Sequence, residues 1–188
     1  MIDDGDFPEL LGRAQRGEQA AVTVLFREFQ PPLLRYLRAR VDRALADDIA
    51  GDVWAAVAAG IGSFQGDTGN FRAWLFTIAR NRTNDHHRTS ARRRTDAVAE
   101  VPEQLTEAAE TVALDGLSGQ DAVDLMRRHL TDDQLEVLLL RVLGDLDAAQ
   151  VAALLGRPET WVRVTQHRAI QRLNARIAPV LGHDGDSV

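Results

Sequence analysis

The chain contains no cysteine and no lysine among its 188 residues. Without cysteine it cannot form a disulfide bond, a thiolate zinc site or a thiol redox switch. No apolar run approaches the roughly 18 to 20 residues that a membrane-spanning helix needs. The first ten residues carry acids where a signal peptide carries cations. These absences predict a soluble, cytoplasmic protein with no membrane insertion.

Basic residues, all 22 of them arginine, are unevenly spread along a chain whose formal net charge is −6. Residues 70–94 hold seven arginines and one acid, and residues 157–176 hold five arginines and one acid. Residues 95–126, between these segments, hold eight acids and no base. A net negative charge normally argues against nucleic acid as a partner, but two separate basic segments can still bind an anion at two places.

Apolar residues recur at helical spacing along most of the chain, and strand signals are scarce. We therefore expect an all-α fold. In the first half we expect two helices within residues 8–40, interrupted near Pro31 and Pro32, one over 46–59, and one from 70 into the arginine-rich segment. In the second half the spacing predicts helices over residues 120–130, 131–143, 148–155 and 158–177.

Apolar periodicity fades between residues 95 and 118, where proline and glycine lie among acids and alanines. This stretch predicts an acidic linker between two small helical domains, residues 8–94 and 119–178. Local signals in the second domain are specific. Thr131 and Asp147 are expected N-caps, and Gly156 is expected to end a helix.

The segment NFRAWLFTIARNRTNDHHRTSARRR (Asn70–Arg94) begins as an amphipathic helix and ends as a run of basic and polar residues. Its first half places four apolar residues at helical spacing, which we expect in the core: Phe71, Trp74, Leu75 and Ile78. Beyond them the same stripe carries Arg82 and Asp85, so we expect the helix to leave the core and contact an anionic partner such as DNA. The preceding loop FQGDTGN (Phe64–Asn70) adds an aromatic ring, glycines and small polar groups, which suit single-stranded DNA.

Residues 148–177 have the proportions of a helix-turn-helix, whose second helix lies in the major groove of DNA. The spacing of that helix predicts an inward face with Val162, Gln166, Ala169 and Leu173. The opposite side carries side chains with the chemistry of base reading, namely Arg163, Val164, His167 and Arg168. Arg172 and Arg176 suit phosphate contacts. A solvated arginine face on a bundle helix is the alternative interpretation.

Two further motifs are weaker. DHH (Asp85–His87) is similar to a metallophosphoesterase signature, but the sequence holds no further metal-ligand cluster, and adjacent histidines lie about 100° apart on a helix. GIGSFQG (Gly60–Gly66) is similar to a dinucleotide-binding loop, but its third glycine is one position late and no strand precedes it. No set of nucleophile, base and orienting residue stands out. We therefore expect neither an enzyme nor a bound metal or cofactor.

Two blocks of the sequence resemble the extracytoplasmic-function (ECF) group of bacterial RNA polymerase sigma factors. The first is similar to region two of that family and consists of RGEQAAVTVLFREF (Arg16–Phe29), DDIAGDVWAA (Asp47–Ala56) and SFQGDTGNFRAWLFTIARNRTNDHHR (Ser63–Arg88). The second is similar to region four and consists of LTDDQLEVLLLRVLGDLDAAQVAALLGRPETWVRVTQHRAIQRL (Leu130–Leu173). The resemblance covers about residues 8–178 and implies a non-catalytic initiation factor that gives RNA polymerase its promoter specificity.

The resemblance also implies roles for individual residues. Contacts to the promoter −10 element, made as the duplex opens, would come from Phe64, Asp67, Thr68, Asn70, Asn81, Arg82, Arg88, Arg92, Arg93 and Arg94. Contacts to the −35 element would come from Arg141, Thr160, Arg163, Val164, His167, Arg168 and Arg172. The helix from Asp47 corresponds to the part of region two that docks on the β′ clamp helices of core RNA polymerase, through Asp47, Asp48, Asp52 and Trp54.

The implied partners are core RNA polymerase, at its β′ clamp helices and β flap, promoter DNA and an anti-sigma factor. The acidic spacer would thread into channels of the polymerase. Three positions depart from the family pattern: Gly51 stands where glutamine is usual, Gln166 where an apolar residue is usual, and Thr165 where a basic residue is frequent. A stand-alone helix-turn-helix regulator is the main alternative for residues 130–173, and a phosphohydrolase resting on DHH is another. The regulator leaves residues 47–94 without a role.

Overall fold

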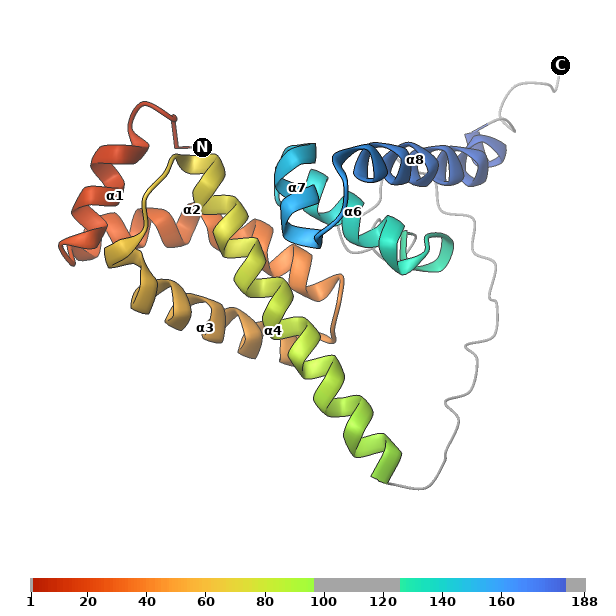
Figure 1. Cartoon of the computed structure of the whole chain (residues 1–188), viewed down its shortest axis with the longest axis horizontal. Helices are drawn as coiled ribbons and strands as arrows, with labels where there is room; N and C mark the ends of the chain where they lie inside the picture. The colour runs from red at the N-terminus through yellow and green to blue at the C-terminus, as the bar shows by residue number, and fades with distance from the viewer. Residues whose placement is uncertain (1, 97–125, 182–188) are drawn as a thin grey trace, which may run out of the picture.

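The computed structural model describes residues 2–96 and 126–181 of the 188-residue chain, with side chains described for 2–89 and 126–175. All regular elements in these ranges are helices, which confirms the all-α prediction. They form two groups (Figure 1). We call α1 to α4 the N-terminal module, and the helical residues 126–129 together with α6 to α8 the C-terminal module. Residues 97–118 of the predicted acidic linker lie outside the described residues.

The N-terminal module consists of α1 (Phe7–Gln15), α2 (Gln19–Arg38), α3 (Arg43–Gly60), the 3-10 turn η1 (Ile61–Ser63) and α4 (Thr68–Asp96). Three phenylalanines from different helices meet in its core. The ring of Phe71 on α4 lies 5.7 Å from that of Phe7 on α1 and 4.9 Å from that of Phe29 on α2. Burial of such large aromatic side chains is the main source of stability for a small helical module.

The predicted break near Pro31 and Pro32 is wrong, because both prolines lie inside α2. A proline within a helix costs about 3 kcal/mol through the lost hydrogen bond and the ring clash. In α2 the apolar stripe continues on both sides of the prolines and is fully buried, at Leu25, Phe29, Leu33 and Leu37. We attribute the continuity of α2 to this packing. The chain turns earlier, at Gly17, whose φ of 80° lies in the left-handed region that glycine tolerates.

The C-terminal module consists of residues 126–129, α6 (Asp132–Val142), α7 (Ala148–Leu155) and α8 (Glu159–Leu181). The predicted N-caps are confirmed, since Thr131 and Asp147 each accept a hydrogen bond from the backbone three residues later, in capping boxes. Gly156 ends α7 with φ 63°, as predicted. The predicted end of the last helix near residue 177 is wrong, because α8 continues past Pro179.

The two modules are packed against each other. In Figure 1, α6 and α7 lie beside the first half of α4, and contacts join α4 to α7. The buried side chains of both modules form one continuous cluster, in which Leu135 and Leu139 of α6 belong with Tyr36 of α2 and Phe76 of α4. The second half of α4 extends beyond the other helices (Figure 1), and most side chains of residues 82–89 are exposed.

Candidate nucleic-acid interface

The loop before α4 is held in one conformation by hydrogen bonds. Asp67 Oδ1 accepts a bond of 2.7 Å from the Asn70 backbone N–H, and Asn70 Oδ1 accepts one of 3.2 Å from the Asp67 N–H. This reciprocal pair caps α4. On the other side, Gln15 Nε2 of α1 donates to the carbonyl oxygens of Ile61, at 3.0 Å, and Phe64, at 2.8 Å. The loop is therefore preorganised in the free chain.

Two residues that were predicted to contact DNA, Phe64 and Thr68, are packed against the core or buried in it. The Phe64 ring stacks on Trp74, with centroids 5.0 Å apart and planes at 21°, and meets Phe71 edge-on at 5.5 Å. Thr68 is 2% exposed, and its Oγ1 has no hydrogen-bond partner among the described residues. Direct contact of Thr68 with DNA would therefore require the start of α4 to shift.

The exposed part of α4 begins one turn later than the apolar spacing predicts. Ala79 and Thr83 are fully buried, whereas Ile78 is only half-buried. Asn81, Arg82 and Arg88 are exposed, as their proposed contact with DNA requires. Arg88 Nη1 lies 3.9 Å from Asp85 Oδ1, a distant pair between exposed groups that contributes little stability. The backbone of Arg92, Arg93 and Arg94 continues α4, and their side chains lie outside the described ones.

Helices α7 and α8 form the predicted helix-turn-helix, with α8 packed against both α6 and α7. Val162 and Ala169 are fully buried, Thr165 is 8% exposed and Leu173 is half-buried, so Thr165 joins the inward face. The other face is exposed at every residue predicted to contact the −35 element on this helix, namely Thr160, Arg163, Val164, His167, Arg168 and Arg172. Val164, at 48% exposed, is a large apolar side chain left open to solvent, as a contact to a thymine methyl requires.

Arg141 differs from the other residues predicted to contact DNA. Its Nε donates a hydrogen bond of 3.1 Å to Gln166 Oε1 on α8, and its Nη1 donates to the carbonyl oxygen of Leu146. The guanidinium thus ties α6 to α8 and to the turn before α7. This pairing also gives Gln166 a polar partner at a half-buried position where an apolar residue was expected.

The acids of α3 that the resemblance assigns to polymerase are exposed: Asp47, Asp48 and Asp52. Asp47 Oδ1 accepts from Arg38 Nη2 at 3.0 Å. Trp54 is half-buried, lies 5.1 Å from the Phe26 ring, and donates through its Nε1 to Gln30 Oε1 at 2.5 Å.

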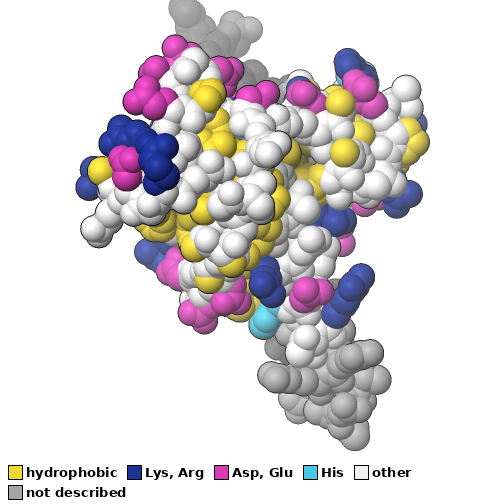
Figure 2. All heavy atoms as spheres, turned by 60° about the vertical axis from the view of Figure 1, so that its left-hand side comes forward, with side chains coloured by type: hydrophobic (Ala, Val, Ile, Leu, Met, Phe, Trp, Pro, Cys, Tyr) yellow, Lys and Arg dark blue, Asp and Glu magenta, His cyan; other side chains and the backbone are white. Residues whose placement is uncertain are grey.

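Apolar side chains are also open to solvent on the N-terminal module. Figure 2, which brings this module forward, shows hydrophobic side chains gathered in the middle of the face with charged ones around them. Helix α2 alone exposes three large apolar residues, Val22, Val24 and Phe26. Apolar side chains gathered on a surface and rimmed by charged ones are typical of a protein-binding face.

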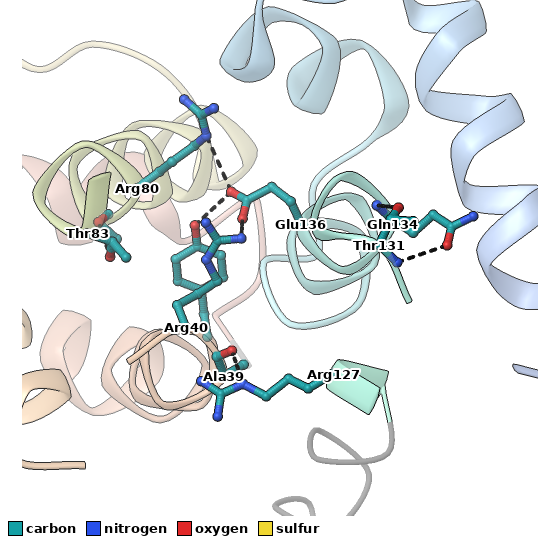
Figure 3. Close-up of polar contacts among 10 residues, drawn as sticks. Ala39, Arg40, Arg80, Thr83, Arg127, Thr131, Gln134 and Glu136 are labelled. Atoms are coloured by element: carbon teal, nitrogen blue, oxygen red, sulfur yellow. Dashed lines mark hydrogen bonds and ion pairs between the residues drawn. The ribbon is translucent and has the colours of Figure 1, made fainter. Parts of the chain in front are cut away.

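A cluster of charged residues lies where the modules meet (Figure 3), and it was not predicted from the sequence. Glu136 of α6 is buried at 6% exposed and contacts three residues of the N-terminal module, Tyr36, Arg40 and Arg80. The only sequence signal was an acid inside the apolar run of α6, which helical periodicity assigns to the core.

The described residues give no sign of a metal site or a membrane span. No three histidine, cysteine, aspartate or glutamate side chains among them are grouped as ligands of a metal ion. None of the helices in the described ranges is both long enough and apolar enough to cross a bilayer.

Two family models match the chain, and together they cover more than half of it. Residues 25–93 match Sigma-70 region 2, and residues 120–173 match Sigma-70, region 4. The first match contains α3 and most of α4 with its preceding loop. The second contains α7, the turn after it and the part of α8 that carries the exposed face. The alternative of a stand-alone regulator gave α3 and α4 no role. The match to Sigma-70 region 2 includes both helices and therefore argues against that alternative.

Similar proteins carry the same description. The ECF RNA polymerase sigma factor BldN of Streptomyces coelicolor is 33% identical over 180 residues, which cover 94% of this chain and 67% of BldN. The ECF RNA polymerase sigma factor SigD of Mycobacterium tuberculosis is 32% identical over 175 residues, covering 89% of this chain and 82% of SigD. Among solved structures, the sigma factor RpoE in complex with the anti-sigma factor NepR from Bartonella quintana has the same fold, with a TM-score of 0.65 and 23% identity over 87% of this chain and 98% of that chain. The chain therefore belongs to the ECF group of RNA polymerase sigma factors, non-enzymatic proteins that direct transcription initiation.

Proposed function

We propose that the two modules divide promoter recognition between them, with α4 and its preceding loop engaging the −10 element and α8 engaging the −35 element. The observation that carries this proposal is the presence of two exposed arginine-bearing helix faces, one in each module, on a chain with a net charge of −6. On an acidic protein such faces are best explained by a polyanion that each of them binds.

At the −10 element, the exposed Asn81, Arg82 and Arg88 meet the DNA directly, and Arg92, Arg93 and Arg94 follow on the same helix. Arginines hold phosphates, while the capped loop from Phe64 to Asn70 receives an unpaired base. Taking a base out of the stack costs a few kcal/mol. A loop already held by Gln15 and by the Asp67 and Asn70 cap does not have to be ordered at that moment, which lowers the total cost.

At the −35 element, Arg163, Val164, His167 and Arg168 read base edges in the major groove. Thr160 and Arg172 position the helix on phosphates. Arg141 acts from behind this surface, because its hydrogen bonds to Gln166 and the Leu146 carbonyl fix α8 relative to α6. Its contribution to DNA binding is therefore to orient the recognition helix.

Core RNA polymerase binds the acidic face of α3, through Asp47, Asp48 and Asp52 with Trp54 beside them, at its β′ clamp helices. The C-terminal module binds the β flap. An acidic face suits a basic partner, and the exposed apolar groups of α2 add area to the contact. The acidic residues between 95 and 126 suit a path through polymerase channels that otherwise hold nucleic acid.

An anti-sigma factor completes the set of partners, and the protein acts in the cytoplasm, where polymerase and promoter are found. The similar fold of RpoE, which is bound to NepR in its solved structure, supports an anti-sigma partner for this chain.

Reconstituted transcription tests the proposal. Core bacterial RNA polymerase with this protein is expected to start transcripts at a defined set of promoters on genomic DNA, mapped by run-off sequencing. Asn81→Ala and Arg163→Ala should each reduce these transcripts. Arg27→Ala, which removes an exposed arginine of α2 to which no DNA contact is assigned, should not. Promoter-specific transcripts that survive Asn81→Ala and Arg163→Ala unchanged would contradict the assigned surfaces.

A further inference from the structure

Glu159 is a single acid among the arginines of the helix that is proposed to enter the major groove. Residues 157–176 hold five arginines and this one acid. Glu159 is the first residue of α8 and is exposed, as are Thr160, Arg163 and Val164 after it. The N-terminal residues of a recognition helix are the ones that contact base edges. None of the proposed −35 contacts uses this carboxylate, although it lies at the end of α8 where bases are read.

In the free protein the carboxylate is held by Arg163, one helical turn later. Arg163 Nε donates a hydrogen bond of 3.0 Å to Glu159 Oε1, and Arg163 Nη2 donates to the same oxygen. The two side chains are 69% and 43% exposed, so the pair contributes little to stability. No other cation among the described residues forms an ion pair with Glu159, and the neighbouring Arg157 lies over the Trp161 ring, with Cζ 5.2 Å from the ring centroid.

A guanine bound by Arg163 takes this partner away from Glu159. When the guanidinium turns to the O6 and N7 atoms of a guanine, its pair with the carboxylate is exchanged for the base. An ionised carboxylate that is removed from water into the groove is strongly unfavourable unless a hydrogen-bond donor meets it. In the major groove cytosine offers the amino donor N4 without an acceptor, whereas guanine and thymine offer only acceptors, and adenine places the acceptor N7 beside its amino group. Cytosine is therefore the base that suits Glu159.

The spacing of the two residues limits where this cytosine can lie. Residues four apart on a helix have Cβ atoms about 5 to 6 Å apart, and successive base pairs of B-form DNA are about 3.4 Å apart. A base contacted by Glu159 thus lies within about two base pairs of the guanine contacted by Arg163. One turn of α8 can read two neighbouring positions of the element.

We propose that Glu159 is a specificity residue of the −35 surface, which accepts a hydrogen bond from N4 of a cytosine beside the guanine that Arg163 binds. The carboxylate also repels bases that present acceptors at that position. Because it repels phosphates as well, it lowers the affinity for DNA in general while it raises the discrimination between sequences. This inference rests on the proposed contact between α8 and the −35 element. The alternative role is purely structural, since an acid in the first turn stabilises the positive N-terminus of a helix.

Selection from a promoter library tests this role in the complete holoenzyme. Core bacterial RNA polymerase and the 188-residue chain are incubated with promoters randomised over the −35 region, and the retained DNA is sequenced. The wild type is expected to enrich cytosine over thymine about tenfold, next to a guanine whose enrichment is lost in Arg163→Ala. Glu159→Ala should abolish the preference for cytosine, keep the preference for guanine, and retain several-fold more of the unselected library.

Two glutamine variants separate base reading from helix stability. Glutamine pairs with N6 and N7 of adenine, so Glu159→Gln should move the preference from cytosine to adenine. Glu9→Gln makes the same change at an exposed acid in the first turn of α1, to which no DNA contact is assigned, and should leave the selected sequence unchanged. Both variants remove a charge from a helix N-terminus, so thermal unfolding should shift slightly and similarly in each.

The outcomes distinguish this inference from the proposed function. No cytosine beside the selected guanine, or a cytosine preference that survives Glu159→Ala, would overturn the role of Glu159. Equal losses at every position in Glu159→Ala and Glu159→Gln would also overturn it and leave Glu159 as a helix-stabilising acid. In each of these cases the proposed function stands as long as the guanine preference depends on Arg163. If the holoenzyme enriches no −35 sequence, the proposed contact between α8 and DNA fails, and the role of Glu159 fails with it.

Discussion

The Tyr36 hydroxyl and the Glu136 carboxylate, 100 residues apart in the sequence, share a buried hydrogen bond of 2.9 Å that joins the two modules. Tyr36 is also the single tyrosine of the chain. Its phenol is therefore a spectroscopic reporter located in the contact itself, and any change in its ionisation reports on that contact alone.

The titration of Tyr36 should differ from that of an exposed tyrosine. Burial, and then the negative charge of Glu136, raise the pKa of Tyr36 well above its ordinary value, while Arg40 and Arg80 oppose this effect. We expect the absorbance change at 295 nm to occur well above pH 10, the usual midpoint for tyrosine. In Glu136→Gln the midpoint should fall, because both the neighbouring charge and the sealed environment are lost. An unchanged midpoint in that variant would mean that the charge of Glu136 does not act on the Tyr36 phenol.

The same shift makes stability depend on alkaline pH. Tyr36 holds its proton more tightly in the folded chain than in the unfolded chain, so its contribution to stability is complete below about pH 10. It is lost as the pH rises from there through the higher pKa of the folded state. Urea unfolding at a series of pH values should show this loss in the wild type. Tyr36→Phe, which has no proton to lose, should show a smaller decline over the same range.

Gly51 is a position where the chain can be made more stable. It lies inside α3, is exposed, and a Cβ atom added there would meet nothing within 4 Å. A glycine inside a helix costs about 1 kcal/mol relative to alanine, so Gly51→Ala should raise the free energy of unfolding by about that amount. Urea unfolding followed by circular dichroism measures this.

A second glycine of the same helix provides the matched control for Gly51. At Gly60 a Cβ atom would lie 2.8 Å from Trp74 Cζ2, against a half-buried aromatic ring. Gly60→Ala should therefore destabilise the protein although it makes the same chemical change. Gly51→Gln, which restores the usual family residue between Asp48 and Asp52, should strengthen binding to core polymerase if this face docks on the clamp helices. Stability gained without tighter binding would place the polymerase contact elsewhere.

Signals that act over three or four residues predicted much of the fold. Thr131 and Asp147 were recognisable as N-caps because the capping box is encoded within one turn, and Gly156 because a left-handed residue at a helix end favours glycine. The exposed face of α8 followed from helical spacing alone, since Val162 and Ala169 fix which side is buried.

Features that depend on distant parts of the chain could not be predicted in this way. The helix continues through Pro31 and Pro32 because its flanking stripe packs against other helices, which local proline rules do not include. The role of Glu136 could not be predicted, since its three partners come from α2, from the loop after α2 and from α4. Arg141 was expected to contact the −35 element, but its guanidinium is hydrogen-bonded to Gln166 and to the Leu146 carbonyl within the module.

Arg163 and Arg172 should differ in the kind of DNA binding that each supports. Both are exposed on α8, but Arg163 lies with Val164 and His167 on the face proposed to enter the groove. Arg163→Ala should cost about 1–3 kcal/mol at the preferred −35 sequence and relax discrimination at one position. Arg172→Ala should weaken binding to all sequences alike. It should also reduce the slope of the logarithm of the binding constant against the logarithm of the salt concentration by about one.

These two outcomes are separated by measuring binding to −35 variants at several salt concentrations. In the free protein Arg163 Nε donates to Glu159 Oε1 at 3.0 Å, an exposed pair that is easily exchanged for a guanine. Equal losses on every sequence for Arg163→Ala would mean that this arginine contacts only phosphate.

Asn70 has two roles that one pair of substitutions can separate. Its side-chain oxygen accepts from the Asp67 N–H, and its backbone N–H donates to Asp67, so Asn70→Ala should lose about 1 kcal/mol of stability through the cap alone. Asn70→Asp keeps an acceptor at the helix N-terminus, where a negative charge is favourable, and should preserve stability. A carboxylate facing the opened DNA strand would nevertheless repel its phosphates. We therefore expect Asn70→Asp to unfold like the wild type in urea but to form fewer open complexes, as detected by permanganate reactivity of unpaired thymines. Normal open complexes with Asn70→Asp would restrict this residue to its capping role.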